Sequence, residues 1–137
     1  MIKKILPYVL MVFLVVIDQI VKWWVLHHSL YTSHVKLNSG FIFGLGHNID
    51  LFLWVSCILI VILFLFTMKK PALQTYNLFV ILGAALGNLI DRIFRGGVVD
   101  YWQISYFNTE IIFNLADVIL VSGVMLYAWQ VGKENQH

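Results

Sequence analysis

The chain has 137 residues, of which 61% are hydrophobic and 12% are charged, and its formal net charge is +2. Soluble domains average about 45–50% apolar and about 25% charged residues, and a domain this small could not bury so much apolar side chain. The composition excludes an ordinary soluble enzyme and a disordered tail, and a single cysteine excludes a disulfide-stapled module. It predicts an integral membrane protein, and the small net charge gives no reason to expect a nucleic-acid partner.

Four apolar segments follow one another along the chain, and each approaches the roughly 20 residues that a helix needs to cross a bilayer. They predict an all-α integral membrane fold in which residues 1–137 form one membrane domain. The transmembrane helices are expected at about 5–26, 51–68, 76–94 and 111–131. Outer loops are expected at about 27–50 and 95–110. Glycines and aromatic residues at 35–44 predict a short β-hairpin at the membrane surface.

The charges predict the orientation of the helices. Five lysines flank one side of the membrane: Lys3, Lys4, Lys69, Lys70 and Lys133. Because cytoplasmic loops are enriched in Lys and Arg, both termini are expected in the cytoplasm. The N-terminus imitates a signal peptide, but no small-residue cleavage site follows it, so we expect a retained helix. An aromatic belt at the outer interface is predicted from Trp23, Trp24, Tyr101, Trp102 and Tyr106.

Three of the predicted helices carry an aspartate at a similar depth. At about 1.5 Å per residue, Asp18, Asp91 and Asp117 lie about 20, 22 and 21 Å from the cytoplasmic ends of their helices. An aspartate near the centre of a membrane helix costs about 2.5–3.5 kcal/mol, so three at one level indicate a polar pocket that opens outward. Asp100 lies just outside the third helix, within reach of this pocket.

Polar partners lie one helical turn from these acids and share a face with them. The pairs are Asp18 with Lys22, Asn88 with Asp91, and Asn114 with Asp117. Asp18–Lys22, and Asp91 beside Arg92, are interpreted as structural ion pairs. Asp100 and Asp117 have no cation within one turn, which favours a functional role.

Two carboxyl groups held close together titrate as a unit. The ionised group can take a proton from water while the protonated group polarises a carbonyl, as in aspartic proteases. We find no serine-hydrolase, zinc-protease or phosphate-loop motif, and we expect neither a metal nor a cofactor. The residues alone leave two alternatives open: an acid–base hydrolase, or a small membrane proton-relay or transport protein that uses the same acids.

Four motifs in order resemble those of prokaryotic lipoprotein signal peptidase, also called signal peptidase II. Residues 18–22 resemble D-x-x-x-K, and residues 38–44 resemble N-x-G-x-x-F-G. Residues 83–101 resemble the block G-x-x-x-G-N-x-x-D-R followed by V-x-D-[FY], and residues 113–117 resemble F-N-x-A-D. The resemblance covers most of the chain and all four predicted helices.

The resemblance implies an intramembrane aspartic endopeptidase of the bacterial cytoplasmic membrane. It would remove the signal peptide of a prolipoprotein by cutting before the diacylglyceryl-modified Cys, with its site toward the outer face. The implied residues are Asp100 and Asp117 for catalysis; Asn38, Gly40, Asn88, Arg92 and Asn114 for substrate binding and orientation; and Asp18, Lys22 and Asp91 for support. The substrate's signal helix would lie beside the first, third and fourth helices, among membrane lipids, and the inhibitor globomycin would occupy the same pocket.

Overall fold

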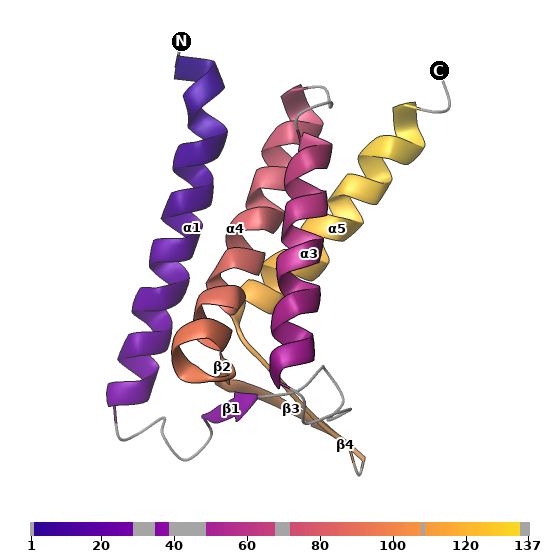
Figure 1. Cartoon of the computed structure of the whole chain (residues 1–137). Helices are drawn as coiled ribbons and strands as arrows, with labels where there is room; N and C mark the ends of the chain where they lie inside the picture. The colour runs from indigo at the N-terminus through magenta and orange to yellow at the C-terminus, as the bar shows by residue number, and fades with distance from the viewer. Residues whose placement is uncertain (1, 29–34, 39–48, 68–71, 108, 135–137) are drawn as a thin grey trace.

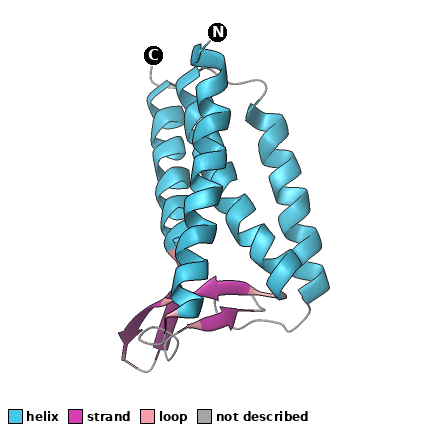
Figure 2. Cartoon of the chain, turned by 90° about the vertical axis from the view of Figure 1, so that its left-hand side faces the viewer, coloured by secondary structure: helices cyan, strands magenta, loops and turns pink. Residues whose placement is uncertain are grey.

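The computed structural model describes residues 2–28, 35–38, 49–67, 72–107 and 109–134. Within these ranges the chain forms a bundle of four helices with four short strands at one end (Figures 1 and 2). The elements are α1 (Ile2–His27), β1 (Lys36–Asn38), α3 (Ile49–Thr67), α4 (Ala72–Arg95), β2 (Val98–Asp100), β3 (Trp102–Tyr106), β4 (Thr109–Phe113) and α5 (Leu115–Glu134). α1 begins and α5 ends at the end of the bundle opposite the strands (Figure 1).

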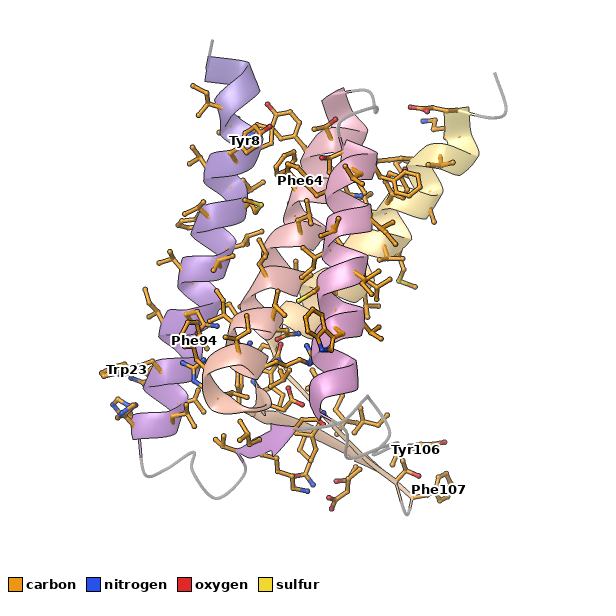
Figure 3. The ribbon with its side chains drawn as sticks, viewed as in Figure 1. Tyr8, Trp23, Phe64, Phe94, Tyr106 and Phe107 are labelled. Carbon is orange, nitrogen blue, oxygen red and sulfur yellow. The ribbon has the colours of Figure 1, made fainter. Side chains whose placement is uncertain are left out.

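Among the described residues, three helices are long and apolar enough to cross a membrane: Ile5–His27, Thr75–Arg95 and Leu115–Glu134. A fourth apolar segment, Trp54–Thr67 within α3, is shorter. The outer faces of the bundle carry many exposed apolar side chains (Figure 3), as expected where the neighbouring solvent is lipid. The predicted fold class, a helical membrane protein with a small β element, is confirmed.

α4 is the central helix of the bundle. α1, α3 and α5 each pack against it, and 61% of its apolar window is buried, compared with 17% for α1 and 11% for α5. Its most buried apolar side chains are Leu78, Phe79, Ile81, Leu82 and Ala84. A polar residue on α4 therefore contacts other protein elements rather than lipid.

Two glycines of α4 let α1 approach closely, and both face α1. A Cβ atom at Gly83 would lie 2.9 Å from the carbonyl oxygen of Met11, and one at Gly87 would overlap Asp18 Oδ2. Small residues at such a crossing allow two membrane helices to approach each other. Here the close approach also brings the Asp18 carboxylate against α4.

The strands form two antiparallel pairs. β1 pairs with β2, so that Lys36 lies opposite Asp100 and Asn38 lies opposite Val98. β3 pairs with β4 in an exposed hairpin, in which Trp102 lies opposite Phe113. At the turn of this hairpin, Tyr106 and Phe107 lie far from the helices (Figure 3).

One boundary prediction is wrong. The fourth helix was expected from residue 111, but residues 111–113 belong to β4 and α5 begins at Leu115. Hydropathy cannot separate a short apolar strand from a helix, and here pairing with β3 decides the conformation. Of the hairpin expected within 35–44, the structure describes residues 35–38, where β1 pairs with β2 from the other predicted loop. Residues 39–48 lie outside the described residues.

Candidate active site

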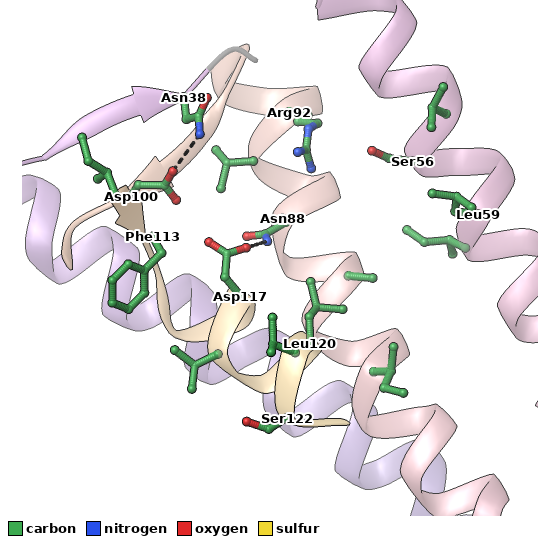
Figure 4. Close-up of a pocket in the computed structure, with 18 of the residues that line it drawn as sticks. Asn38, Ser56, Leu59, Asn88, Arg92, Asp100, Phe113, Asp117, Leu120 and Ser122 are labelled. Carbon is green, nitrogen blue, oxygen red and sulfur yellow. Dashed lines mark hydrogen bonds between the residues drawn. The ribbon is translucent and has the colours of Figure 1, made fainter. Parts of the chain in front are cut away.

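Asp100 ends β2 and is only 2% exposed. Each of its carboxylate oxygens accepts a hydrogen bond from an asparagine amide. Asn38 Nδ2 donates to Oδ2 at 3.0 Å, and Asn114 Nδ2 donates to Oδ1 at 2.7 Å. Asn38 reaches Asp100 because β1 lies directly beside β2 (Figure 4).

Asp117 lies in the first turn of α5, where it forms a reciprocal cap with Asn114. The backbone N–H of Asp117 donates to Asn114 Oδ1 at 3.0 Å, and the backbone N–H of Asn114 donates to Asp117 Oδ2 at 3.1 Å. This is the arrangement of a capping box. The cap places the Asp117 carboxylate at the positive end of the α5 helix dipole.

Amide side chains connect the two acids. Asn114 contacts both of them, and its Nδ2 also donates to Asn88 Oδ1 at 3.2 Å. Asn88 Nδ2 in turn donates to Asp117 Oδ1 at 2.9 Å (Figure 4). Asp100 and Asp117 thus belong to one hydrogen-bonded group contributed by β2, α4 and α5.

Burial raises the pKa of Asp100 from 3.8 to about 6. The negative charge of Asp117 contributes to this rise in the pKa, whereas hydrogen bonds from the amides of Asn38 and Asn114 and the charge of Lys22 limit it. Asp100 is therefore the acid of this group that burial favours in its protonated form.

Lys22 lies at the centre of a second group of buried charges. Its ammonium is 2.7 Å from Asp18 Oδ2 and 2.8 Å from Asp91 Oδ2. Asp91 also pairs with Arg95 and accepts a hydrogen bond from the backbone N–H of Val99 at 3.1 Å. Because Val99 precedes Asp100, this group holds the strand that carries Asp100.

A cavity of about 590 Å³ lies between α3, α4 and α5 and reaches the acids. Its polar lining includes Asn38, Asn88, Arg92, Asp100 and Asp117, together with Ser56 and Ser122 (Figure 4). The rest of the lining is mainly aliphatic side chains of α3 and α5. The cavity therefore combines a polar end that contains two carboxyl groups with an apolar length suited to hydrocarbon.

The chain resembles known proteins over most of its length. A family model described as signal peptidase (SPase) II matches residues 10–132. A lipoprotein signal peptidase of Caldanaerobacter subterraneus subsp. tengcongensis is 32% identical over 136 aligned residues, which cover 88% of this chain and 92% of that protein.

The chain belongs to the signal peptidase II family.

Two solved structures of bacterial membrane enzymes, determined by the in meso method, share this fold. The structure at 2.3 Å resolution has a TM-score of 0.77 and 26% identity, and the match covers 94% of this chain and 88% of that chain. The structure at 1.9 Å resolution has a TM-score of 0.73 and 25% identity, and the match covers 91% of each chain. The family is that of a protease whose substrates are lipoprotein precursors, and the apolar helices agree with a bacterial membrane protein.

The structure brings most of the expected signal peptidase II residues to one end of the bundle. Nine of them lie in the two groups just described or line the cavity: Asp18, Lys22, Asn38, Asn88, Asp91, Arg92, Asp100, Asn114 and Asp117. Gly40 lies outside the described residues. Within the described part of the chain, no group of three or more His, Cys, Asp or Glu is arranged to hold a metal ion.

The expected pairing of Asp91 with Arg92 is replaced by pairing with Lys22 and Arg95. Adjacent residues point to different faces of a helix, whereas residues four apart share a face. Arg92 is therefore left to line the cavity near the acids.

Sequence reasoning missed two contributors to the site. Gln19 bridges the helices, since its Nε2 donates to the Gly87 carbonyl and to Asp91 Oδ1, both at 3.1 Å. Tyr101, expected in the aromatic belt, is buried, and its hydroxyl accepts the backbone N–H of Leu115 at 3.1 Å. Burial raises the pKa of Tyr101 to about 12, so its hydroxyl stays neutral. Their positions next to Asp18 and Asp100 in the sequence could have indicated that Gln19 and Tyr101 contribute to the site.

Proposed function

We propose that this chain is an intramembrane aspartic endopeptidase that cuts prolipoproteins before the diacylglyceryl-modified Cys. The observation that carries the proposal is the hydrogen-bonded group of Asp100 and Asp117 at the polar end of an apolar cavity. Two linked carboxyl groups suit acid–base hydrolysis of a peptide bond. The apolar length beside them suits the hydrocarbon chains of a lipid-modified substrate.

In the proposed reaction, Asp117 is the general base and Asp100 is the general acid. Ionised Asp117 takes a proton from water, and the oxygen of this water bonds to the scissile carbonyl carbon. Asp100 donates its proton to the carbonyl oxygen, which gives a neutral tetrahedral diol. Asp117 then passes its proton to the leaving nitrogen as the C–N bond breaks, and the diol returns a proton to Asp100. Both acids end as they began.

The cap at the start of α5 and the burial of Asp100 support these two roles. The helix N-terminus favours negative charge on Asp117, and the pKa of Asp100, raised to about 6, favours a proton on that residue. Asn38, Asn88 and Arg92 line the cavity beside the acids and are proposed to bind the substrate backbone.

The cavity favours one side of the bundle for the substrate. Its lining comes from α3, α4, α5 and the strands, and no described side chain of α1 contributes to it. We therefore place the lipid-modified segment between α3 and α5, which share few contacts. The signal helix, which the sequence suggested lies beside α1, α4 and α5, would approach the acids from the same side. Globomycin is proposed to occupy the same cavity, among membrane lipids.

The proposed orientation has both termini in the cytoplasm of a bacterium and the acids toward the outer face of the membrane. It is supported by the lysines at one end of the predicted helices and by the position of the strands at the other (Figure 1). The alternative function, transport, has less support. A transport path would need polar side chains along its whole length, and the polar lining lies mainly at one end of the cavity.

The test is cleavage by the purified protein. The protein is incubated with a diacylglyceryl-modified prolipoprotein, and the shortened product is sought on a gel with and without globomycin. Cleavage that globomycin blocks and that Asp117→Asn abolishes is the expected result. A folded wild-type protein that leaves this substrate intact would contradict the proposal.

A further inference from the structure

Lys22 connects the buried charges to the proposed catalytic acids. Its ammonium is fully buried, and Nζ contacts Asp18, Asp91 and, at 2.8 Å, Asn88 Oδ1. Charge balance explains the contacts with the two acids. The contact with the neutral Asn88 amide adds nothing to charge balance. Through this amide, Lys22 is linked to Asp117, because Asn88 also donates a hydrogen bond to Asp117.

The contact with Lys22 determines which way the Asn88 amide points. A lysine ammonium has three donors and no acceptor, whereas an asparagine amide has an acceptor oxygen and a donor NH₂ group. Lys22 therefore holds the oxygen of Asn88 and leaves the NH₂ group directed at Asp117 Oδ1, 2.9 Å away (Figure 4). In the reversed amide, an N–H group would face the ammonium and Asp117 would lose its donor.

The amide of Asn114 is oriented consistently with that of Asn88. Its NH₂ group donates to Asn88 Oδ1 and to Asp100 Oδ1, while its own oxygen accepts the backbone N–H of Asp117. The amide donors of this network thus point toward carboxylates or toward Asn88 Oδ1. Among the described side chains that contact Asn88, Lys22 is the one that can only donate, so it fixes the direction of the Asn88 amide.

We infer that Lys22 is a positioning residue for the acid pair, acting through Asn88 to keep an N–H donor on Asp117. This inference rests on the proposed function, because it assigns Lys22 a role in that same reaction. Lys22 is not among the side chains that line the cavity, so its effect is on the orientation and charge of Asp117 and not on contact with substrate.

Other charged groups face the same acids, and a test must hold them constant. They are Arg92 and Asp91 on α4, Asp18 on α1, and Arg95, which contacts Asp91. Replacing Lys22 alone would leave Asp18 and Asp91 without their shared cation and could prevent folding. The informative comparison is therefore between Asp18→Asn and the charge-balanced double variant Asp18→Asn/Lys22→Met.

The measurement is kcat and KM for prolipoprotein cleavage as a function of pH. Relative to Asp18→Asn, the double variant is expected to lose about 100-fold in kcat because the base is misplaced, with little change in KM. The acidic limb of kcat/KM is expected to move to higher pH, because Asp117 has lost a hydrogen-bond donor and the acids have lost a nearby cation. Arg95→Met, the matched control, removes a cation from Asp91 without touching Asn88, and its acidic limb stays at the wild-type pH.

A rescue variant separates the donor from the charge. Asp18→Asn/Lys22→Gln restores a neutral N–H donor and is expected to recover part of the rate lost with Met. Equal pH profiles in Asp18→Asn and the Met double variant, or no recovery with Gln, would overturn the inference and leave Lys22 with charge balance alone.

A second readout does not require turnover. In protein labelled with nitrogen-15 asparagine, the side-chain amide signals of Asn88 are expected to shift as the acid pair titrates in Asp18→Asn and to stop responding in the Met double variant. Identical responses would overturn the inference even if the enzyme is fully active. Loss of cleavage in the wild-type protein, with the NMR difference intact, would overturn the proposed function instead.

Discussion

The two groups of buried acids are built differently, although both depend on α4. Asp18 and Asp91 each form a direct ion pair with Lys22. Asp100 and Asp117 accept hydrogen bonds from amide and backbone N–H groups, and within the described residues neither forms an ion pair. Each acid of the first group thus has a charged partner, whereas each acid of the second group has only neutral hydrogen-bond donors within the described residues. We therefore expect the first group to stabilise the fold, and the second group to carry the proposed proton transfer.

The strongest test of this difference between the two groups is to neutralise the acids of the second group. Asp100→Asn and Asp117→Asn are each expected to lower kcat for prolipoprotein cleavage by about 10⁴-fold, because a general acid or base is lost. Both variants are expected to fold in detergent, although Asn replaces one acceptor oxygen with an NH₂ donor and therefore loses one of the two hydrogen bonds that each carboxylate accepts. Substantial turnover by either purified variant would show that these acids do not transfer the protons.

The first group is expected to respond in stability instead. Asp91→Asn leaves Lys22 and Arg95 without a shared anion, and breaking a buried ion pair costs about 3–5 kcal/mol. The free energy of unfolding, measured in detergent with a chemical denaturant, should fall by this amount. Glu110→Gln is the matched control: its ion pair with Lys36 joins exposed side chains at 3.5 Å and should be worth less than about 1 kcal/mol. Similar losses in both variants would contradict the scaffold role.

The pH dependence of stability should come from the second group. The pKa of Asp100 is about 6 in the folded chain and near 3.8 when unfolded. The unfolded chain therefore loses this proton first, and stability falls as pH rises from about 4 to above 6, by about 3 kcal/mol. Thermal midpoints of the wild type and Asp100→Asn, measured from pH 4 to pH 8, should diverge in this window, with the variant less sensitive to pH. Parallel curves would mean that burial does not raise the pKa of Asp100.

The smallest expected effect comes from disturbing the close approach of α1 to α4, which supports the first group. A methyl group at Gly87 would overlap Asp18 Oδ2, so Gly87→Ala should destabilise the protein by about 1–3 kcal/mol. A Cβ atom at Gly132 meets nothing within 4 Å, so Gly132→Ala is the control and should leave the thermal midpoint unchanged. Equal midpoints for the two variants would mean that α1 can move away from α4 without cost.

Much of the helical bundle was predictable from the sequence, because hydropathy and the cost of burying acids act along single helices. The similar depths of Asp18, Asp91 and Asp117 predicted one polar pocket, but only Asp117 of the three lines the cavity, and Asp18 and Asp91 are buried against Lys22. The i,i+4 pair of Asp18 and Lys22 was also predictable, since both residues lie on one helical face. The roles of Asp100 and Asp117 stay predictions.

The parts that could not be predicted depend on contacts between distant segments. Pairing of β1 with β2 brings Asn38 to Asp100 across 62 positions of sequence. The choice of Lys22 over Arg92 as the partner of Asp91 depends on how closely α1 approaches α4. Residues 111–113 are apolar enough for a helix, and only their pairing with β3 makes them a strand.

The position of Asn114 at the start of the last helix matters for how the protein is made. This one side chain begins α5, holds Asp117 through the cap and bridges to Asp100. Completing the last helix and assembling the two acids are therefore a single event. A chain whose C-terminal segment has not yet entered the bilayer lacks Asp117 in the site, so we expect a newly made molecule to acquire hydrolytic capacity only when its insertion is complete.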